Sequence, residues 1–247
     1  MAKTGQITIF IIFGIFLFLI LAAFFFFSFK EKPEPNVLNT GPIQEYIQSC
    51  LKKTLEDAVF ENSRRGGYFI LSEKSTLEST ENVPYYLNGK ENIFPTDEIL
   101  AQQLSKYVDS LVGLCVTDFS KDSDYNINFS KPSSQVILTT QKIILNTNLL
   151  ATITKNNQVK EISSFVTEIS SKKMYSAFQT AKQIVQSQKD EEVCLSCFSE
   201  LASQNGLFVN LLSVSNDTYL FDIEQSEYLH EGEKYHLRFA VRYNEKE

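Results

Sequence analysis

The longest apolar stretch of the chain lies near its N-terminus, where residues 7–29 give 23 consecutive positions without a charged side chain. Phenylalanine occupies nine of these positions. A helix rises about 1.5 Å per residue, so about 20 apolar residues cross a hydrocarbon core of roughly 30 Å. We therefore predict that residues 1–29 form one transmembrane anchor helix. Cleaved secretory signals end in small residues, whereas this run leads directly into Lys30, which favours a permanent anchor.

The pattern changes after this run. Residues 30–41 contain two prolines and no apolar periodicity, which predicts a stalk that separates the membrane from a folded part. Residues 42–247 contain no comparable apolar run and are predicted to form one extracytoplasmic domain. If this domain is divided, the expected sub-boundary lies near residues 120–130, between a helical half and a sheet-rich half.

Apolar residues spaced three and four apart predict amphipathic helices in this domain. The first begins at Pro42 and ends at Gly66-Gly67, and the second is capped by Thr96. A further helix is predicted for residues 172–189. The apolar stripes of the first two helices contain Ile43, Ile47, Cys50, Leu51, Leu55, Leu100, Leu104, Val108, Leu111 and Cys115.

Alternating apolar and polar residues predict strands elsewhere. The pattern runs through residues 127–169, where Asn156-Asn157 is placed to make a tight hairpin turn. A second hairpin is predicted to turn at Asn216-Asp217 and to be followed by a last strand, and residues 68–71 are predicted as a short strand. The expected fold class is α+β, with amphipathic helices packed on a largely antiparallel sheet.

The net charge of the chain and the basic residues beside the apolar run bear on its binding partners and its orientation in the membrane. The net charge is −7, which argues against nucleic acid and against an anionic membrane surface as partners. Lys3 flanks one end of the apolar run, whereas Lys30 and Lys32 flank the other, so basic residues alone do not decide the orientation. Two glycosylation sequons begin at Asn128 and Asn216, and they fit an outward-facing domain.

The four cysteines are an even number, and an oxidising exterior would allow two disulfides. Cys50 and Cys115 each lie on the apolar stripe of a predicted helix, so we favour a bond between them. This leaves Cys194 with Cys197 as the second pair. Free buried thiols are the alternative.

The Cys194-Leu195-Ser196-Cys197 motif is the only local sequence with a chemical mechanism behind it, because paired thiols can exchange with disulfides. Acidic residues at 190–192 raise a thiol pKa, which favours a structural disulfide over a thiol–disulfide oxidoreductase. The spacing of the four cysteines does not match a structural zinc site.

Only two histidines are present, His230 and His236. His236 shares the polar side of the last strand with Arg238 and Arg242, where a carboxylate or a phosphorylated glycan could bind. Basic residues also protect exposed strand edges from aggregation, and we favour that interpretation. The sequence contains no nucleophile elbow, Walker loop or dinucleotide fingerprint, so no catalytic, cofactor-binding or metal-binding residue is predicted.

The N-terminal sequence, Lys3-Thr4-Gly5-Gln6-Ile7, resembles the KGQ-type start of archaeal class III signal segments. In pilins and archaellins of that class a peptidase cuts after the glycine, and the hydrophobic helices bundle into a filament core. The resemblance implies a processing site between Gly5 and Gln6.

A longer resemblance is to membrane-anchored proteins of unknown function from small-genome DPANN archaea. The similar blocks are residues 43–51, the Gly66-Gly67-Tyr68 turn, residues 104–115 and residues 239–243. This resemblance implies an archaeal cell-surface protein with its N-terminus in the cytoplasm, and it implies no activity.

These observations together predict a non-enzymatic, single-pass surface protein with a structural or adhesive role. One alternative is a pilin-like filament subunit that assembles through its N-terminal helix, where Gly14, Ala22 and Ala23 allow close helix packing. The other is a thiol–disulfide oxidoreductase. The expected partners are the lipid bilayer and further copies of the chain.

Overall fold

An α+β fold, as predicted, is present in the computed structural model of the chain. The residues that it describes are 4–28, 38–71, 76–77, 82–121, 125–187 and 193–243. The chain divides into two compact units, Met1–Asn39 and Thr40–Glu247. The predicted stalk falls mostly on residues 30–37, which lie outside the described residues.

The first unit contains helix α1, Thr4–Ser28, whose 25 residues include no charged side chain. Its described side chains, those of residues 13–25, are all exposed. Among the residues that the structure describes, no helix is both long enough and apolar enough to cross a membrane.

Four described helices belong to the second unit: α2 Gly41–Arg64, α3 Asp97–Lys121, α4 Lys172–Ser187 and α5 Leu195–Gln204. The first three confirm the sequence prediction. The Thr96 hydroxyl accepts a hydrogen bond from the backbone N–H of Ile99 (3.3 Å), which confirms the predicted cap of α3. Helix α5 was not predicted, because it is short and buries only Phe198 and Ala202.

A mixed sheet forms one layer of the second unit, in the strand order β1-β2-β10-β9-β8, with β3 paired to β2. The pair β10–β2 is parallel, whereas the other pairs are antiparallel, so the predicted antiparallel character holds for all but this pair. Its strands are β1 Thr76–Leu77, β2 Val83–Asn88, β3 Glu91–Asn92, β8 Phe208–Ser213, β9 Thr218–His230 and β10 Glu233–Arg242.

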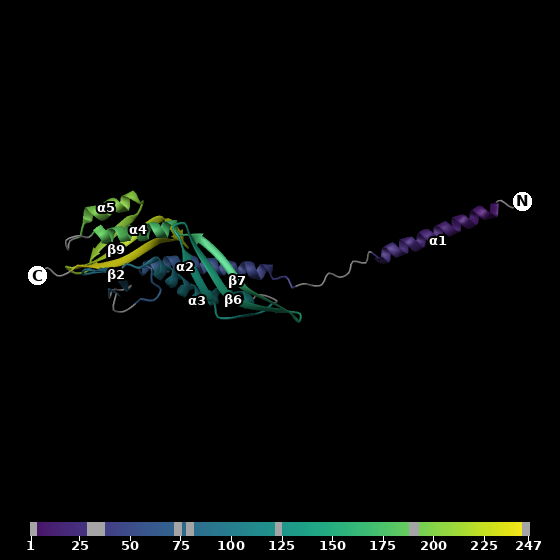
Figure 1. The fold of residues 1–247 in the computed structure, drawn as a ribbon, viewed down its shortest axis with the longest axis horizontal. Helices are drawn as coiled ribbons and strands as arrows, with labels where there is room; N and C mark the ends of the chain where they lie inside the picture. Colours follow the sequence, from purple (N-terminus) through teal and green to yellow (C-terminus); the bar gives the residue numbers. More distant parts are fainter. Residues whose placement is uncertain are drawn as a thin grey trace. The chain divides into compact units, whose positions relative to one another are not determined.

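A separate antiparallel sheet contains β4 Asn126–Phe129, β5 Ser133–Leu138, β6 Lys142–Lys155 and β7 Gln158–Ser170. The long hairpin β6–β7 turns at Asn156 and Asn157, both with positive φ (+49° and +64°), which confirms the predicted turn. Figure 1 shows this hairpin beside α2, and α4 over β9.

One face of the mixed sheet carries the core. Tyr235, Leu237 and Phe239 of β10 are fully buried. The Phe239 ring stacks between Tyr86 and Phe221, with ring centroids 4.5 and 5.1 Å away. The helices cover this face, because the Tyr235 hydroxyl donates to Ser63 Oγ of α2 (2.8 Å) and Phe198 of α5 packs edge-on against Phe221.

The opposite face of β10 carries the half-buried His236, Arg238 and Arg242, and also Ala240, which is buried in a small apolar cluster with Leu77 and Tyr85. Strand β10 lies between β2 and β9, so it is not a sheet edge. The prediction that these basic residues protect an exposed edge is therefore wrong. The alternation of apolar and polar residues predicts the two faces of β10 correctly, but it does not show how many strands pair with β10.

Residues 68–71 do not form the predicted strand. The backbone N–H groups of Phe69 and Ile70 donate instead to one side-chain oxygen, Gln103 Oε1, at 3.0 and 3.1 Å. Gln103 lies on α3, so this segment is held by a helix side chain and has no strand partner.

Gly67 offers a test of how closely α2, α3 and α4 approach one another. Its φ is +86°, and an added Cβ would meet Leu100 Cδ2 at 2.3 Å and Phe178 Cζ at 3.0 Å. Gly232 has a similar φ of +88° but no atom within 4 Å of an added Cβ. We expect Gly232→Ala to lower the free energy of unfolding by about 1–2 kcal/mol, and Gly67→Ala by about 1–3 kcal/mol more.

Guanidinium unfolding of the full chain in detergent, followed by circular dichroism, measures both changes. Equal losses for the two variants would show that the neighbours of Gly67 relax freely.

The buried tyrosines predict a loss of stability at high pH. Burial raises the pKa of both Tyr107 and Tyr228 to about 12, and it raises the pKa of Tyr235 further. The unfolded chain releases these protons near pH 10, so the stabilisation is complete below about pH 10 and is lost as the pH rises towards 12. We expect the phenolate absorbance of these buried tyrosines to increase, and the circular dichroism signal to decrease, together between about pH 10 and pH 12. Titration of all 11 tyrosines near pH 10 in a folded chain would contradict this expectation.

Candidate functional site

Both predicted disulfides are present, Cys50–Cys115 and Cys194–Cys197. The first joins α2 to α3, with a Cα–Cα distance of 5.7 Å and a sequence separation of 65. Cys50 is buried, and the Tyr46 hydroxyl donates to the carbonyl of Cys115 at 3.0 Å. Closing so long a loop typically stabilises a fold by about 2–4 kcal/mol, so this bond braces the helical layer.

The second disulfide lies at the start of α5, where Cys194 is the N-cap residue. A thioredoxin-like centre places its two cysteines between a strand and a helix, within a strand–helix–strand unit. In the part of the chain that the structure describes, the element before α5 is another helix, α4. The arrangement therefore differs from the one on which the oxidoreductase alternative depends.

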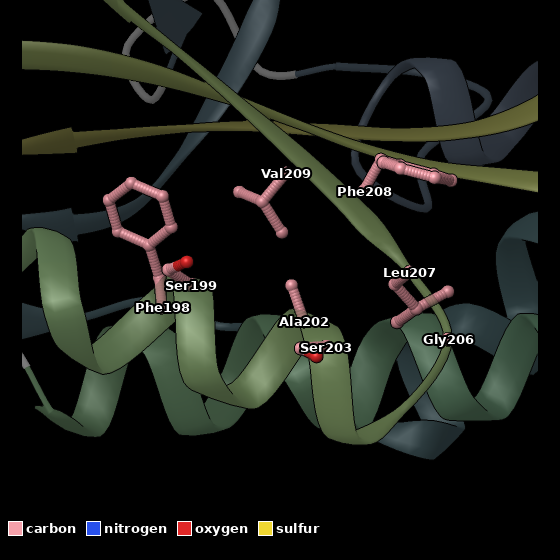
Figure 2. Close-up of a pocket in the computed structure, with 8 residues that line it drawn as sticks. All are labelled: Phe198, Ser199, Ala202, Ser203, Gly206, Leu207, Phe208 and Val209. Carbon is pink, nitrogen blue, oxygen red and sulfur yellow. The ribbon is translucent and has the colours of Figure 1, made fainter.

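A pocket of about 450 Å³, lined by Phe198, Ala202, Leu207 and Val209 together with Ser199 and Ser203, lies between α5 and β8. Figure 2 shows Phe198 and Ala202 on the helix side of the pocket and Val209 on the strand side. Among the described residues, no charged side chain lines it. Its chemistry suits an apolar side chain of a binding partner.

Beside this pocket, β8 is an edge strand that pairs with β9 alone among the described strands. We define the α5–β8 surface as the exposed edge formed by β8 and the adjacent α5, with the apolar residues Leu195, Phe198, Phe208, Leu212 and Val214. Phe208 and Leu212 alternate with Val209 and Leu211, so they lie on the face of β8 that points away from α5. Phe208 and Leu212 are 63% and 61% exposed. Strand β8 contains no charged residue, whereas the longer edge strand β7 carries Lys160, Glu161 and Glu168. The edge strand β5 is also uncharged, but the backbone N–H of its Val136 donates to Ser105 Oγ of α3. An uncharged edge can accept a further strand.

The two histidines occupy different environments. His236 Nδ1 lies 2.9 Å from Asp222 Oδ1, and Arg238 Nε donates to the other oxygen of Asp222 at 3.2 Å. Arg242 stacks on the Tyr85 ring, 4.5 Å from its centroid. All three side chains therefore already have partners on the sheet.

His230 meets residues that the sequence analysis did not connect with it. Its Nε2 lies 2.5 Å from Asp57 Oδ1 of α2, and Glu231 follows it in the β9–β10 turn. A sequence separation of 173 residues hides the pair from any local pattern. These three residues can in principle hold a metal ion.

The remaining predicted site residues are spread over the chain. Gly5 and Gln6 lie at the start of α1. Asn128 lies in β4 and Asn216 lies between β8 and β9, and both side chains are exposed. The threonine of the second sequon, Thr218, is buried, so exposure is established for the two asparagine side chains and not for both whole sequons.

Comparison with protein-family models, curated protein sequences and solved structures finds no match to this chain. Its function is therefore argued from its own residues.

Proposed function

We propose that this chain is a single-pass, membrane-anchored surface protein whose extracytoplasmic domain has a structural or adhesive role and no enzymatic activity. The observation that supports an adhesive role is the uncharged, apolar α5–β8 surface at a sheet edge.

The anchor rests on the sequence. The described side chains of α1 run only from residue 13 to residue 25, whereas the uncharged run covers residues 7–29. That run is long enough for a hydrocarbon core of roughly 30 Å. The two disulfides support an oxidising exterior for the domain, and the resemblance to archaeal surface proteins supports a cytoplasmic N-terminus.

The proposed occupant of the α5–β8 surface is β8 of a second copy of the chain. Two such strands can pair antiparallel about a two-fold axis, which places the same residues on both sides of the contact. Because β8 carries no charge, nothing on the strand repels its copy. Anchoring to one membrane raises the local concentration of the copies and favours such a contact.

A pilin-like filament subunit is the second candidate. The start Lys3-Thr4-Gly5-Gln6 and the small residues Gly14, Ala22 and Ala23 favour it, because small residues let helices approach closely. In this alternative the N-terminal helices, and not β8, hold the copies together.

The anchor is tested in native membranes. We expect alkaline carbonate to leave the chain in the membrane fraction, and detergent to release it. Protease added to intact cells should digest residues 42–247. Release by carbonate, or full protection from protease, would contradict the proposal.

The mass of the N-terminal peptide distinguishes the filament subunit from the simple anchor. A chain that begins at Gln6 supports the filament, whereas retained residues 1–5 support the simple anchor.

The contact is tested by placing a charge on each of the edge strands β8 and β7. Leu212→Lys in β8 and Val166→Lys in β7 alter side chains that are 61% and 59% exposed, so both variants should fold. We expect Leu212→Lys to weaken cross-linked dimer formation in membranes by about tenfold, through lost apolar burial. Val166→Lys should leave dimer formation unchanged. Equal dimer yields for both variants would exclude β8 as the contact.

A further inference from the structure

A polar pocket of about 320 Å³ lies between α2 and the turn that joins β9 to β10. We propose that Asp57, His230 and Glu231 in this pocket bind one zinc ion, with water in the remaining position. This site is independent of the anchor and of the α5–β8 surface.

The geometry brings the three ligands together before any metal arrives. One ligand atom from each residue lies within 4.8 Å of the other two. Zinc bonds to carboxylate oxygen and imidazole nitrogen are about 2.0–2.2 Å long, which puts tetrahedral ligands about 3.4 Å apart. The side chains of His230 and Asp57 are 18% and 31% exposed, so they are held by packing yet remain open to solvent. Zinc binding needs two small adjustments: the Glu231 carboxylate moves inward, and His230 Nε2 and Asp57 Oδ1, now 2.5 Å apart, separate by about 0.9 Å.

The charges around the pocket favour a dication. Four carboxylates line it, and Arg64 lies 3.3 Å from two of them, Glu61 and Glu233. The other two carboxylates are those of the proposed ligands, Asp57 and Glu231. Among the described residues, Lys53 is the one further cation lining the pocket, with its Nζ 2.7 Å from Glu231 Oε1. A bound dication balances both carboxylates and releases Lys53 to solvent.

The three ligand groups, one imidazole and two carboxylates, indicate which metal ion fits the site. Calcium takes six to eight oxygen ligands, and magnesium favours octahedral oxygen sites, so one imidazole with two carboxylates suits neither. Zinc accepts this combination, and three protein ligands leave one position open. The ion would tie α2, which also carries the Cys50–Cys115 disulfide, to the tip of the β9–β10 hairpin.

The two histidines provide a matched pair of variants for the test. Each lies beside an aspartate, His230 beside Asp57 and His236 beside Asp222, but only the first pair has a third ligand within reach among the described residues. We expect the untagged full chain in detergent to bind one zinc ion, measured by calorimetry or by competition with a chromophoric chelator. His230→Gln should weaken zinc affinity by at least about tenfold, and His236→Gln should leave it unchanged.

Lys53→Met is the second variant, because it removes the competing cation without touching a ligand. It should tighten zinc binding, a gain that loss of folding cannot mimic. Circular dichroism confirms that each variant is folded. The proposal is overturned if the wild-type chain binds no zinc, if His230→Gln binds as the wild-type chain does, or if Lys53→Met weakens binding.

Discussion

The close approach of the α2 C-terminus to the mixed sheet is the contact on which the rest of the domain depends. The hydroxyl of Tyr86 donates to the carbonyl of Gly66 at 2.9 Å, and the hydroxyl of Tyr235 donates to Ser63 Oγ at 2.8 Å. Both rings are fully buried, so each hydroxyl would cost several kcal/mol if it had no partner. The glycine turn lets the chain leave α2 without a Cβ, and the helix can therefore lie directly on the aromatic face of the sheet.

This packing places most of the core on one face of the sheet, while the opposite face buries only a small cluster of Leu77, Tyr85 and Ala240. The helices cover the face that carries Tyr235, Leu237 and Phe239, while the opposite face has cross-strand ion pairs such as Arg238 with Asp222. The charges on that face are paired within the sheet and leave little capacity for a ligand. The surfaces that can bind a partner or an ion therefore lie at the uncharged edge strand β8 and at the β9–β10 turn.

The elements that the sequence predicted well are those with a strong local signal. Long helices with a continuous apolar stripe, such as α2 and α3, place an apolar residue on every turn. Asn156-Asn157 readily adopts the positive φ that a two-residue hairpin needs. The Cys50–Cys115 bond followed from the same signal, because both cysteines lie on those stripes.

The sequence by itself determined the apolar N-terminal run, the α+β class and the disulfide partners, because composition and periodicity are properties of neighbouring residues. Only the tertiary structure decided that β10 pairs in parallel with β2, that Gln103 holds the backbone of residues 69–70, and that Asp57 meets His230. Each of these is a contact between distant segments. Such contacts depend on how the helices and sheets pack in three dimensions, and a one-dimensional pattern carries no record of that packing.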